Sequence, residues 1–156
     1  MLGDYDGEWG IAGDRPLLGD FDDDGKVDVA MFRPSTGAWY IRRSSGGFTT
    51  TQWGVDGDIP VAGDFDGDTI SDVAIYRPST GQWYVNKSSG GTLVASWGIS
   101  TDMPVAGDWD ADGRSDFTIW RPSTGAWFTL FAAGGSSIAQ WGLTDDRPTG
   151  RAAVIP

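Results

Sequence analysis

Three short loops of this chain concentrate aspartate at regular intervals. They read DFDDDGKVD over residues 20–28, DFDGDTISD over 64–72 and DWDADGRSD over 108–116, and each places Asp at loop positions 1, 3, 5 and 9. A hard cation such as Ca²⁺ takes six to eight oxygen ligands and mixes carboxylates with main-chain carbonyls and water. Alternate residues on a tightly curled loop can aim their side chains inward, so this spacing indicates calcium binding.

The predicted ligands are the four carboxylates of each loop and the main-chain carbonyl at position 7. They are Asp20, Asp22, Asp24, Lys26 and Asp28 in the first loop, Asp64, Asp66, Asp68, Ile70 and Asp72 in the second, and Asp108, Asp110, Asp112, Arg114 and Asp116 in the third. The loops are not EF-hands, because an EF-hand needs a bidentate Glu at position 12. That position holds Met31, Ile75 and Ile119 here.

Two other interpretations of the acidic loops are weaker. Solvated surface acids would not keep the same alternate spacing three times. An acid–base catalytic pair needs two carboxylates in unlike environments, whereas three copies of one loop supply like environments. The twelve predicted carboxylate ligands also exceed the net charge of −11, so the rest of the molecule is close to neutral. We therefore expect up to three bound Ca²⁺ ions, one for each loop.

The loops belong to an internal repeat of 44 residues. The pair Trp-Gly begins at Trp9, Trp53, Trp97 and Trp141, and the turn RPSTG recurs at the same step. Three full units cover residues 9–52, 53–96 and 97–140, with partial units at 1–8 and 141–156. Because a repeat of this length indicates stacked supersecondary units, we treat the chain as a single repeat domain.

Each unit reads as four short β-strands. In the second unit these are IPVAGDF, SDVAIYRP, QWYVNK and TLVASWG, separated by the acidic loop, by PSTG and by SSGG. No stretch carries apolar residues at helical spacing over three turns. Four strands in about 40–50 residues are typical of a propeller blade. The predicted fold is all-β, with three four-stranded antiparallel blades and partial blades at both ends.

The pattern D-x-D-x-D-G-x-x-D before a short apolar strand, followed by RPSTG-x-W, resembles the FG-GAP or VCBS repeat family. These are the calcium-binding blades of integrin-alpha-like propellers, and bacterial secreted proteins carry many of them. The resemblance implies a Ca²⁺ site between the first two strands of each blade, held by the residues named above. Loop position 6 departs from the pattern, because Thr69 stands where the other loops have Gly25 and Gly113. A β-branched residue resists positive φ, so we expect the second site to be the weakest or differently shaped.

Composition excludes several classes of function. The chain has no Cys and no His, so it lacks soft-metal ligands, the usual zinc ligand and the commonest general base. Its net charge disfavours nucleic acid and anionic membranes. No run of residues is long and apolar enough for membrane insertion. The acidic start MLGDYDGEWG is not a signal peptide. We expect an extracellular or cell-surface protein whose export signal has been removed or lies outside this chain.

Three residue types have competing roles. The recurring Trp residues are expected to pack between blades rather than stack on a ligand. Arg33, Arg77 and Arg121 end the second strand of each unit and could line a groove for acidic or sugar ligands. We expect them instead to pair with the recurring aspartates, Asp14, Asp58 and Asp102, or to stack on Trp. Asp23 falls outside the ligand pattern and is expected to face water.

The functional prediction is a non-catalytic, extracellular, calcium-binding structural or adhesive module. Alternatives are a lectin-like carbohydrate-binding module and an accessory domain of a larger secreted enzyme. Propellers close with about four to eight blades, so three blades leave exposed edges that favour self-association into a closed oligomer or a filament. A fragment of a longer propeller would show the same ends. Glycans or cell-surface proteins are further candidate partners.

Overall fold

The computed structural model describes residues 9–148, and these contain twelve β-strands and no helix. The strands form three antiparallel sheets. The first holds β1 Arg15–Gly19, β2 Asp28–Arg33, β3 Ala38–Arg42 and β4 Phe48–Gln52; the second β5 Ile59–Gly63, β6 Asp72–Arg77, β7 Gln82–Asn86 and β8 Thr92–Ser96; the third β9 Met103–Gly107, β10 Asp116–Arg121, β11 Ala126–Leu130 and β12 Ser136–Gln140. The predicted all-β fold of four-stranded antiparallel blades is confirmed. The described residues include no helix that could span a membrane.

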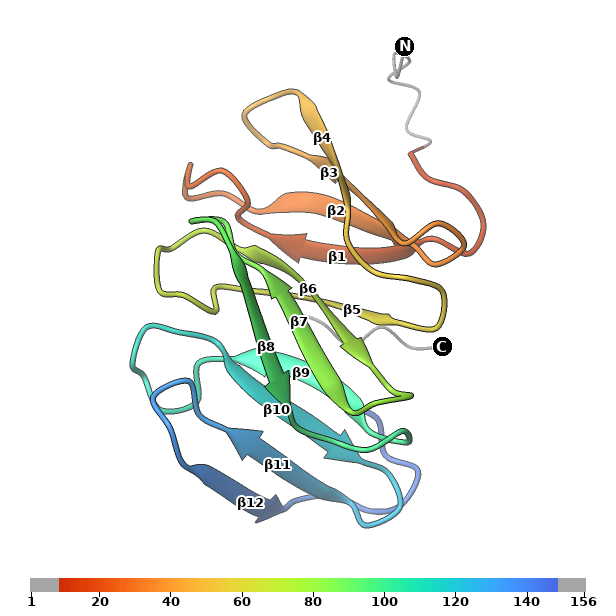
Figure 1. Ribbon diagram of the computed structural model, residues 1–156, viewed down its shortest axis with the longest axis vertical. Helices are drawn as coiled ribbons and strands as arrows, with labels where there is room; N and C mark the ends of the chain where they lie inside the picture. The colour runs from red at the N-terminus through yellow and green to blue at the C-terminus, as the bar shows by residue number, and fades with distance from the viewer. Residues whose placement is uncertain (1–8, 149–156) are drawn as a thin grey trace.

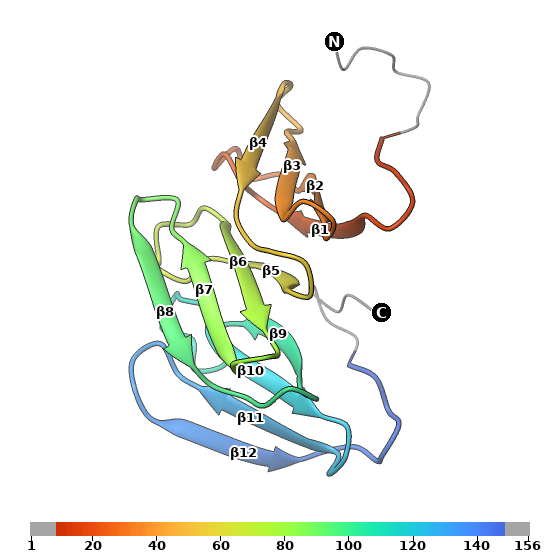
Figure 2. The ribbon, with the colours of Figure 1, turned by 45° about the vertical axis from the view of Figure 1, so that its right-hand side comes forward.

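Each sheet is a simple meander whose strands pair in chain order. The first strand of each sheet lies beside the first strand of the next, so β1 contacts β5 and β5 contacts β9. Figures 1 and 2 show the three sheets stacked face against face, with the acidic loops at one end of the strands. This stacking is the blade-to-blade arrangement of a propeller, and it places successive acidic loops next to one another.

The strand register repeats with the 44-residue step. Leu17 pairs with Ala30 in the first sheet, and Val61 pairs with Ala74 at the same place in the second. In the third sheet Val105 pairs with Thr118. A one-residue slip would exchange the two faces of a strand. In β4 and β8 half-buried positions alternate with exposed ones, so a slip there would turn the half-buried residues outward.

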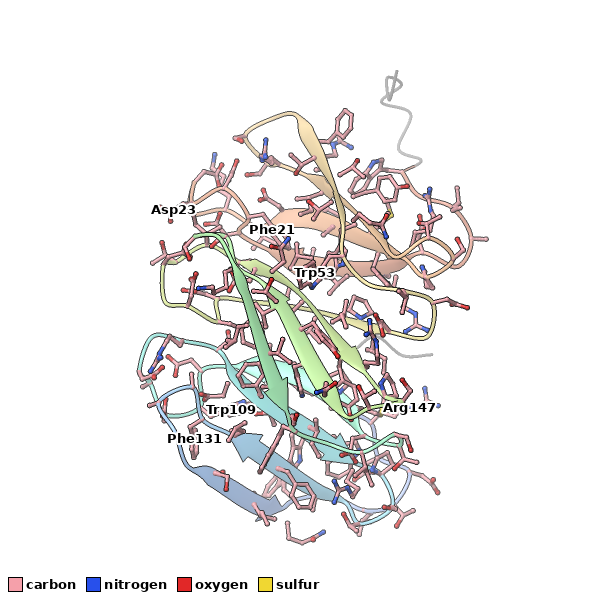
Figure 3. The ribbon with its side chains drawn as sticks, viewed as in Figure 1. Phe21, Asp23, Trp53, Trp109, Phe131 and Arg147 are labelled. Carbon is pink, nitrogen blue, oxygen red and sulfur yellow. The ribbon has the colours of Figure 1, made fainter. Side chains whose placement is uncertain are left out.

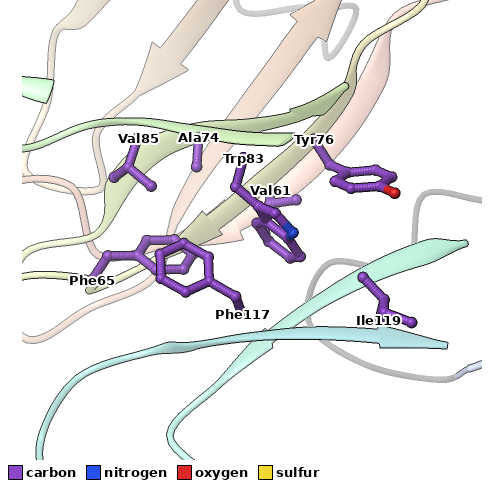
Figure 4. Packing of buried hydrophobic residues seen from close by; sticks show 8 residues of the cluster. All are labelled: Val61, Phe65, Ala74, Tyr76, Trp83, Val85, Phe117 and Ile119. Atoms are coloured by element: carbon purple, nitrogen blue, oxygen red, sulfur yellow. The ribbon is translucent and has the colours of Figure 1, made fainter. Parts of the chain in front are cut away.

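Two apolar clusters join the sheets. The first lies between the first and second sheets, where Phe32 and Trp39 face Ile75 and all three are buried. Phe21 and Trp53 pack against this cluster from the acidic loop and from the connection after β4 (Figure 3). The second lies between the second and third sheets and is shown in Figure 4. There Phe65 stacks on Phe117 with ring centroids 5.1 Å apart.

The repeated Trp residues serve this packing, as expected. Trp39 and Trp83 are fully buried, and the indole of Trp83 donates to the carbonyl of Trp97. Trp53 and Trp97 lie in the connections after β4 and β8 rather than in strands, which corrects the predicted end of the fourth strand. Both reach across a blade boundary, because their indoles donate to the carbonyls of Tyr84 and Phe128.

The arginines that end the second strand form ion pairs within their own blades. Arg77 holds Asp58 through two hydrogen bonds of 2.8 Å, and Arg33 and Arg121 hold Asp14 and Asp102 in the same way. The hydrogen bond from Arg33 lowers the pKa of Asp14. The predicted pairing is confirmed, but the guanidinium groups stack over Tyr40, Tyr84 and Phe128 rather than over Trp. The predicted partial unit 1–8 lies outside the described residues. So do residues 149–156 of the second predicted partial unit, 141–156.

Candidate metal centre

The acidic loops join the first strand of each blade to its second strand, as the resemblance implied. In each loop the aspartates at positions 1, 3 and 9 come together, with one carboxylate oxygen of each residue within 4.8 Å of the others. The three groups are Asp20, Asp22 and Asp28; Asp64, Asp66 and Asp72; and Asp108, Asp110 and Asp116. The repeat therefore places nine of the twelve predicted carboxylates in three equivalent triads.

The aspartate at position 9 is the buried anchor of each triad. Asp72 is 1% exposed and accepts hydrogen bonds from the Phe65 amide (2.8 Å) and the Ser88 amide (2.7 Å). Asp28 and Asp116 are equally buried and accept two amides in the same way. This carboxylate ties the acidic loop to the turn between the third and fourth strands. It has a structural role that does not depend on a metal.

The aspartate at position 1 shapes the loop around itself. The carboxylate of Asp64 accepts hydrogen bonds from the amides of Gly67, Asp68 and Thr69. Asp20 and Asp108 likewise accept the amide at position 6, at 2.9 Å. These short-range bonds curl the loop and turn the carboxylates at positions 1 and 3 toward the anchor at position 9.

The aspartate at position 5 does not join the triads. Asp24 and Asp68 instead accept hydrogen bonds from the hydroxyls of Ser44 and Ser88 in the turn after the third strand. Ser45 and Ser89 donate similarly to Asp22 and Asp66 at position 3. These serines were missed by the sequence analysis, although the recurrence of SSGG at the 44-residue step could have identified them. The position-7 residues, Lys26, Ile70 and Arg114, lie in the loops, and coordination through their carbonyls stays a prediction.

Two carboxylate oxygens inside the triads indicate that the loops fit a cation. Oδ1 of Asp22 and Oδ1 of Asp66 are both buried and have no hydrogen-bond donor. A buried anionic oxygen without a partner is costly, because it has lost its hydration without compensation. The donor set consists of oxygen atoms alone, which suits Ca²⁺ and does not suit softer metals. The residues present therefore fit the ion that the repeat pattern implies.

Burial and neighbouring charges act against ionisation of two aspartates in the loops. Burial raises the pKa of Asp72 despite the two amides that it accepts. In the third loop, partial desolvation and the neighbouring charges of Asp112 and Asp116 raise the pKa of Asp110. Burial also works to raise the pKa of Asp66, but the hydrogen bonds from Ser89 and Asp68 outweigh it, and the pKa is lowered. A bound divalent cation would supply charge compensation to Asp72 and Asp110.

The second loop keeps the shape of the other two in spite of Thr69. The φ of Thr69 is +76°, close to the +78° of Gly25 and the +89° of Gly113. Its hydroxyl donates to the carboxylate of Asp23 in the first loop at 2.7 Å. Asp23 is exposed, as expected. Through Thr69 it also contacts the next blade. The lower affinity of the second site stays a prediction.

The third loop differs more in its surroundings. Ala132 and Ala133 replace the two serines of the neighbouring turn, and the guanidinium of Arg114 binds Asp112 instead. The hydrogen bond from Arg114 lowers the pKa of Asp112. Asp108 and Asp110 are exposed, whereas their counterparts in the first two loops are half-buried. This loop lies at the end of the stack, where no further described blade covers it.

Three stacked four-stranded blades, each with an aspartate triad between its first two strands, define a propeller-type repeat protein with candidate cation sites. Residues 20–75 match the family model described as FG-GAP-like repeat. This match confirms the resemblance to the FG-GAP repeat family and spans the first acidic loop, the second loop and the strands β2 to β5 between them.

Comparisons with whole proteins add information on the fold alone. A solved structure described as a streptogramin B lyase superposes with a TM-score of 0.56 at 12% sequence identity. The superposition covers 91% of this chain and 44% of the other, so this chain spans less than half of that protein. No curated protein matches the chain. At this identity the likeness concerns the arrangement of blades and not the chemistry.

Proposed function

We infer that the chain is a non-catalytic, calcium-stabilised structural module of an extracellular or cell-surface protein. The observation that carries this proposal is the partnerless buried oxygen of Asp22 and of Asp66, each inside an aspartate triad. Three equivalent triads at one end of the stacked sheets are suited to ions that hold the acidic loops in place. A catalytic centre would instead bring unlike groups together. Extracellular calcium concentrations would keep sites of ordinary modular affinity occupied.

The two outer faces of the stack favour self-association of this module. Leu18 and Val29 on the first sheet are 52% and 43% exposed, whereas their counterparts Ala62 and Val73 are buried against the first sheet. In the third acidic loop Trp109 is 56% exposed, whereas its counterpart Phe65 is buried. Trp141, which follows β12, is 78% exposed. Exposed apolar surface of this kind is typical of association sites.

Sedimentation velocity of the calcium-loaded chain tests the proposed self-association. We expect dimers or larger species at micromolar concentrations, and we expect them to dissociate when Trp109→Ser or Trp141→Ser removes an exposed indole. Phe48→Ser is the matched control, because Phe48 is also a half-exposed aromatic residue but lies on the outer strand β4. Its removal should leave association unchanged. A wild-type chain that stays monomeric at all concentrations would contradict self-association.

A further inference from the structure

We propose that the calcium sites of neighbouring blades are linked in series, so that an ion bound in one loop raises the affinity of the next loop. The proposal rests on the calcium-binding function inferred above and deepens it. It assigns a positioning role to the residues that join the loops across each blade boundary.

A main-chain hydrogen bond joins each pair of loops. The amide of Ser71 donates to the carbonyl of Asp20 at 2.6 Å, and the amide of Ser115 donates to the carbonyl of Asp64 at 2.5 Å. In both pairs the donor immediately precedes the buried anchor of one triad, and the acceptor is the position-1 aspartate of the previous triad. One hydrogen bond and one residue therefore lie between the position-1 aspartate of one triad and the position-9 aspartate of the next.

This approach requires a residue without a side chain before each acceptor. A Cβ atom on Gly19 would lie 2.7 Å from the hydroxyl oxygen of Ser71, and one on Gly63 would lie at the same distance from that of Ser115. The φ angles of these glycines are not in the positive range that disfavours side chains. Close contact with the next blade, rather than backbone conformation, thus accounts for the Gly that precedes Asp20 and Asp64.

Gly107 occupies the same position in the third blade and shows the contrast. The atoms nearest to a Cβ atom there would belong to the ring of Trp109, from its own loop, at 3.2 Å and beyond. No further described blade approaches this glycine. The chain therefore contains its own control position, which has the same local sequence and no link across a blade boundary.

The first two loops have an additional side-chain link. The hydroxyl of Thr69 donates to Asp23 at 2.7 Å. Each of these residues replaces a small residue of the other loops, since Gly25 and Gly113 correspond to Thr69, and Gly67 and Ala111 correspond to Asp23. The two departures contact each other. They strengthen the connection between the first and second sites and have no counterpart between the second and third.

The sign of the coupling distinguishes this link from simple electrostatics. Two divalent cations in neighbouring loops repel each other, so charge alone makes the second ion bind more weakly. Asp72 is already held by two amides, and an ion in the second loop would restrain it and the adjacent Ser71 amide further. The Ser71 amide in turn holds the Asp20 peptide in place. The first loop then loses less conformational freedom when it binds its own ion. We expect a neighbouring ion to tighten binding about fivefold.

A calorimetric titration of the folded chain with Ca²⁺ tests the proposal. The wild type and Gly107→Ala should bind with positive cooperativity, whereas Gly63→Ala should lose the coupling between the second and third sites. Thr69→Gly, which copies the other two loops, should weaken the coupling between the first and second sites and provides the test if Gly63→Ala does not fold. Ser71→Ala keeps the amide and should leave cooperativity unchanged.

The outcomes separate this proposal from the calcium function itself. Three ions bound independently or with negative cooperativity would overturn the coupling and leave the calcium function in place. Equal cooperativity in wild type, Gly63→Ala and Thr69→Gly would overturn the proposed path. An absence of calcium binding in all variants would overturn both the coupling and the calcium function.

Discussion

Removal of calcium is expected to lower the melting temperature of this protein by about 15–30 °C. A ligand that binds only the folded state stabilises it by about 2.7 kcal/mol at a hundredfold excess over its Kd, so three filled sites give about 8 kcal/mol. For a chain of this size, each kcal/mol shifts the midpoint by about 2–4 °C. The measurement is thermal unfolding in excess Ca²⁺ and in excess chelator, followed by circular dichroism in the near-ultraviolet.

The control for this experiment is a chain with Asp22→Asn, Asp66→Asn and Asp110→Asn, which removes one charge from each triad. Its melting temperature should be the same with calcium and with chelator. A wild-type midpoint that does not change on chelation would contradict the assignment of the three triads as calcium sites.

The second large effect is expected from Asp72→Ala, and it should be present even without calcium. This substitution removes a carboxylate that is 1% exposed and leaves the amides of Phe65 and Ser88 without their acceptor. Each buried amide left unpaired costs about 1–3 kcal/mol. We therefore expect Asp72→Ala to lower the free energy of unfolding by about 2–6 kcal/mol in chelator, measured by urea denaturation.

Asp66→Asn is the matched comparison. The Oδ1 atom of Asp66 has no hydrogen-bond donor, so a neutral amide of the same shape should cost little in chelator. It should instead remove the second site's share of the calcium-dependent stability. Together the two variants separate the structural anchor from the metal ligand. Equal stability of Asp72→Ala and wild type in chelator would show that the anchor role is wrong.

The repeat explains why the strands and the aspartate triads could be predicted from the sequence. Turn residues, alternating apolar positions and the acidic loop recur three times at one step, so a local signal too weak in one copy becomes strong in three. Positions 1, 3 and 9 of each loop converge because they are close in the chain and short hydrogen bonds curl the loop between them, as around Asp64.

Contacts between units were harder to predict. The Ser71–Asp20 hydrogen bond and the Thr69–Asp23 contact join residues about 50 positions apart, and their proximity depends on how the sheets stack. The serines at 44–45 and 88–89 belong to a different loop of the same blade, so the pattern of the acidic loop did not include them. From the sequence alone, Thr69 is only a departure from the loop pattern, because its partner Asp23 lies in the neighbouring loop.

The most direct test of the account is a count of the calcium ions held by the folded chain, by equilibrium dialysis at saturating Ca²⁺. The three triads predict three ions per chain, and Asp66→Asn should hold two. A folded wild-type chain that holds no calcium would contradict the central claim, because the buried oxygens of Asp22 and Asp66 would then remain without compensation.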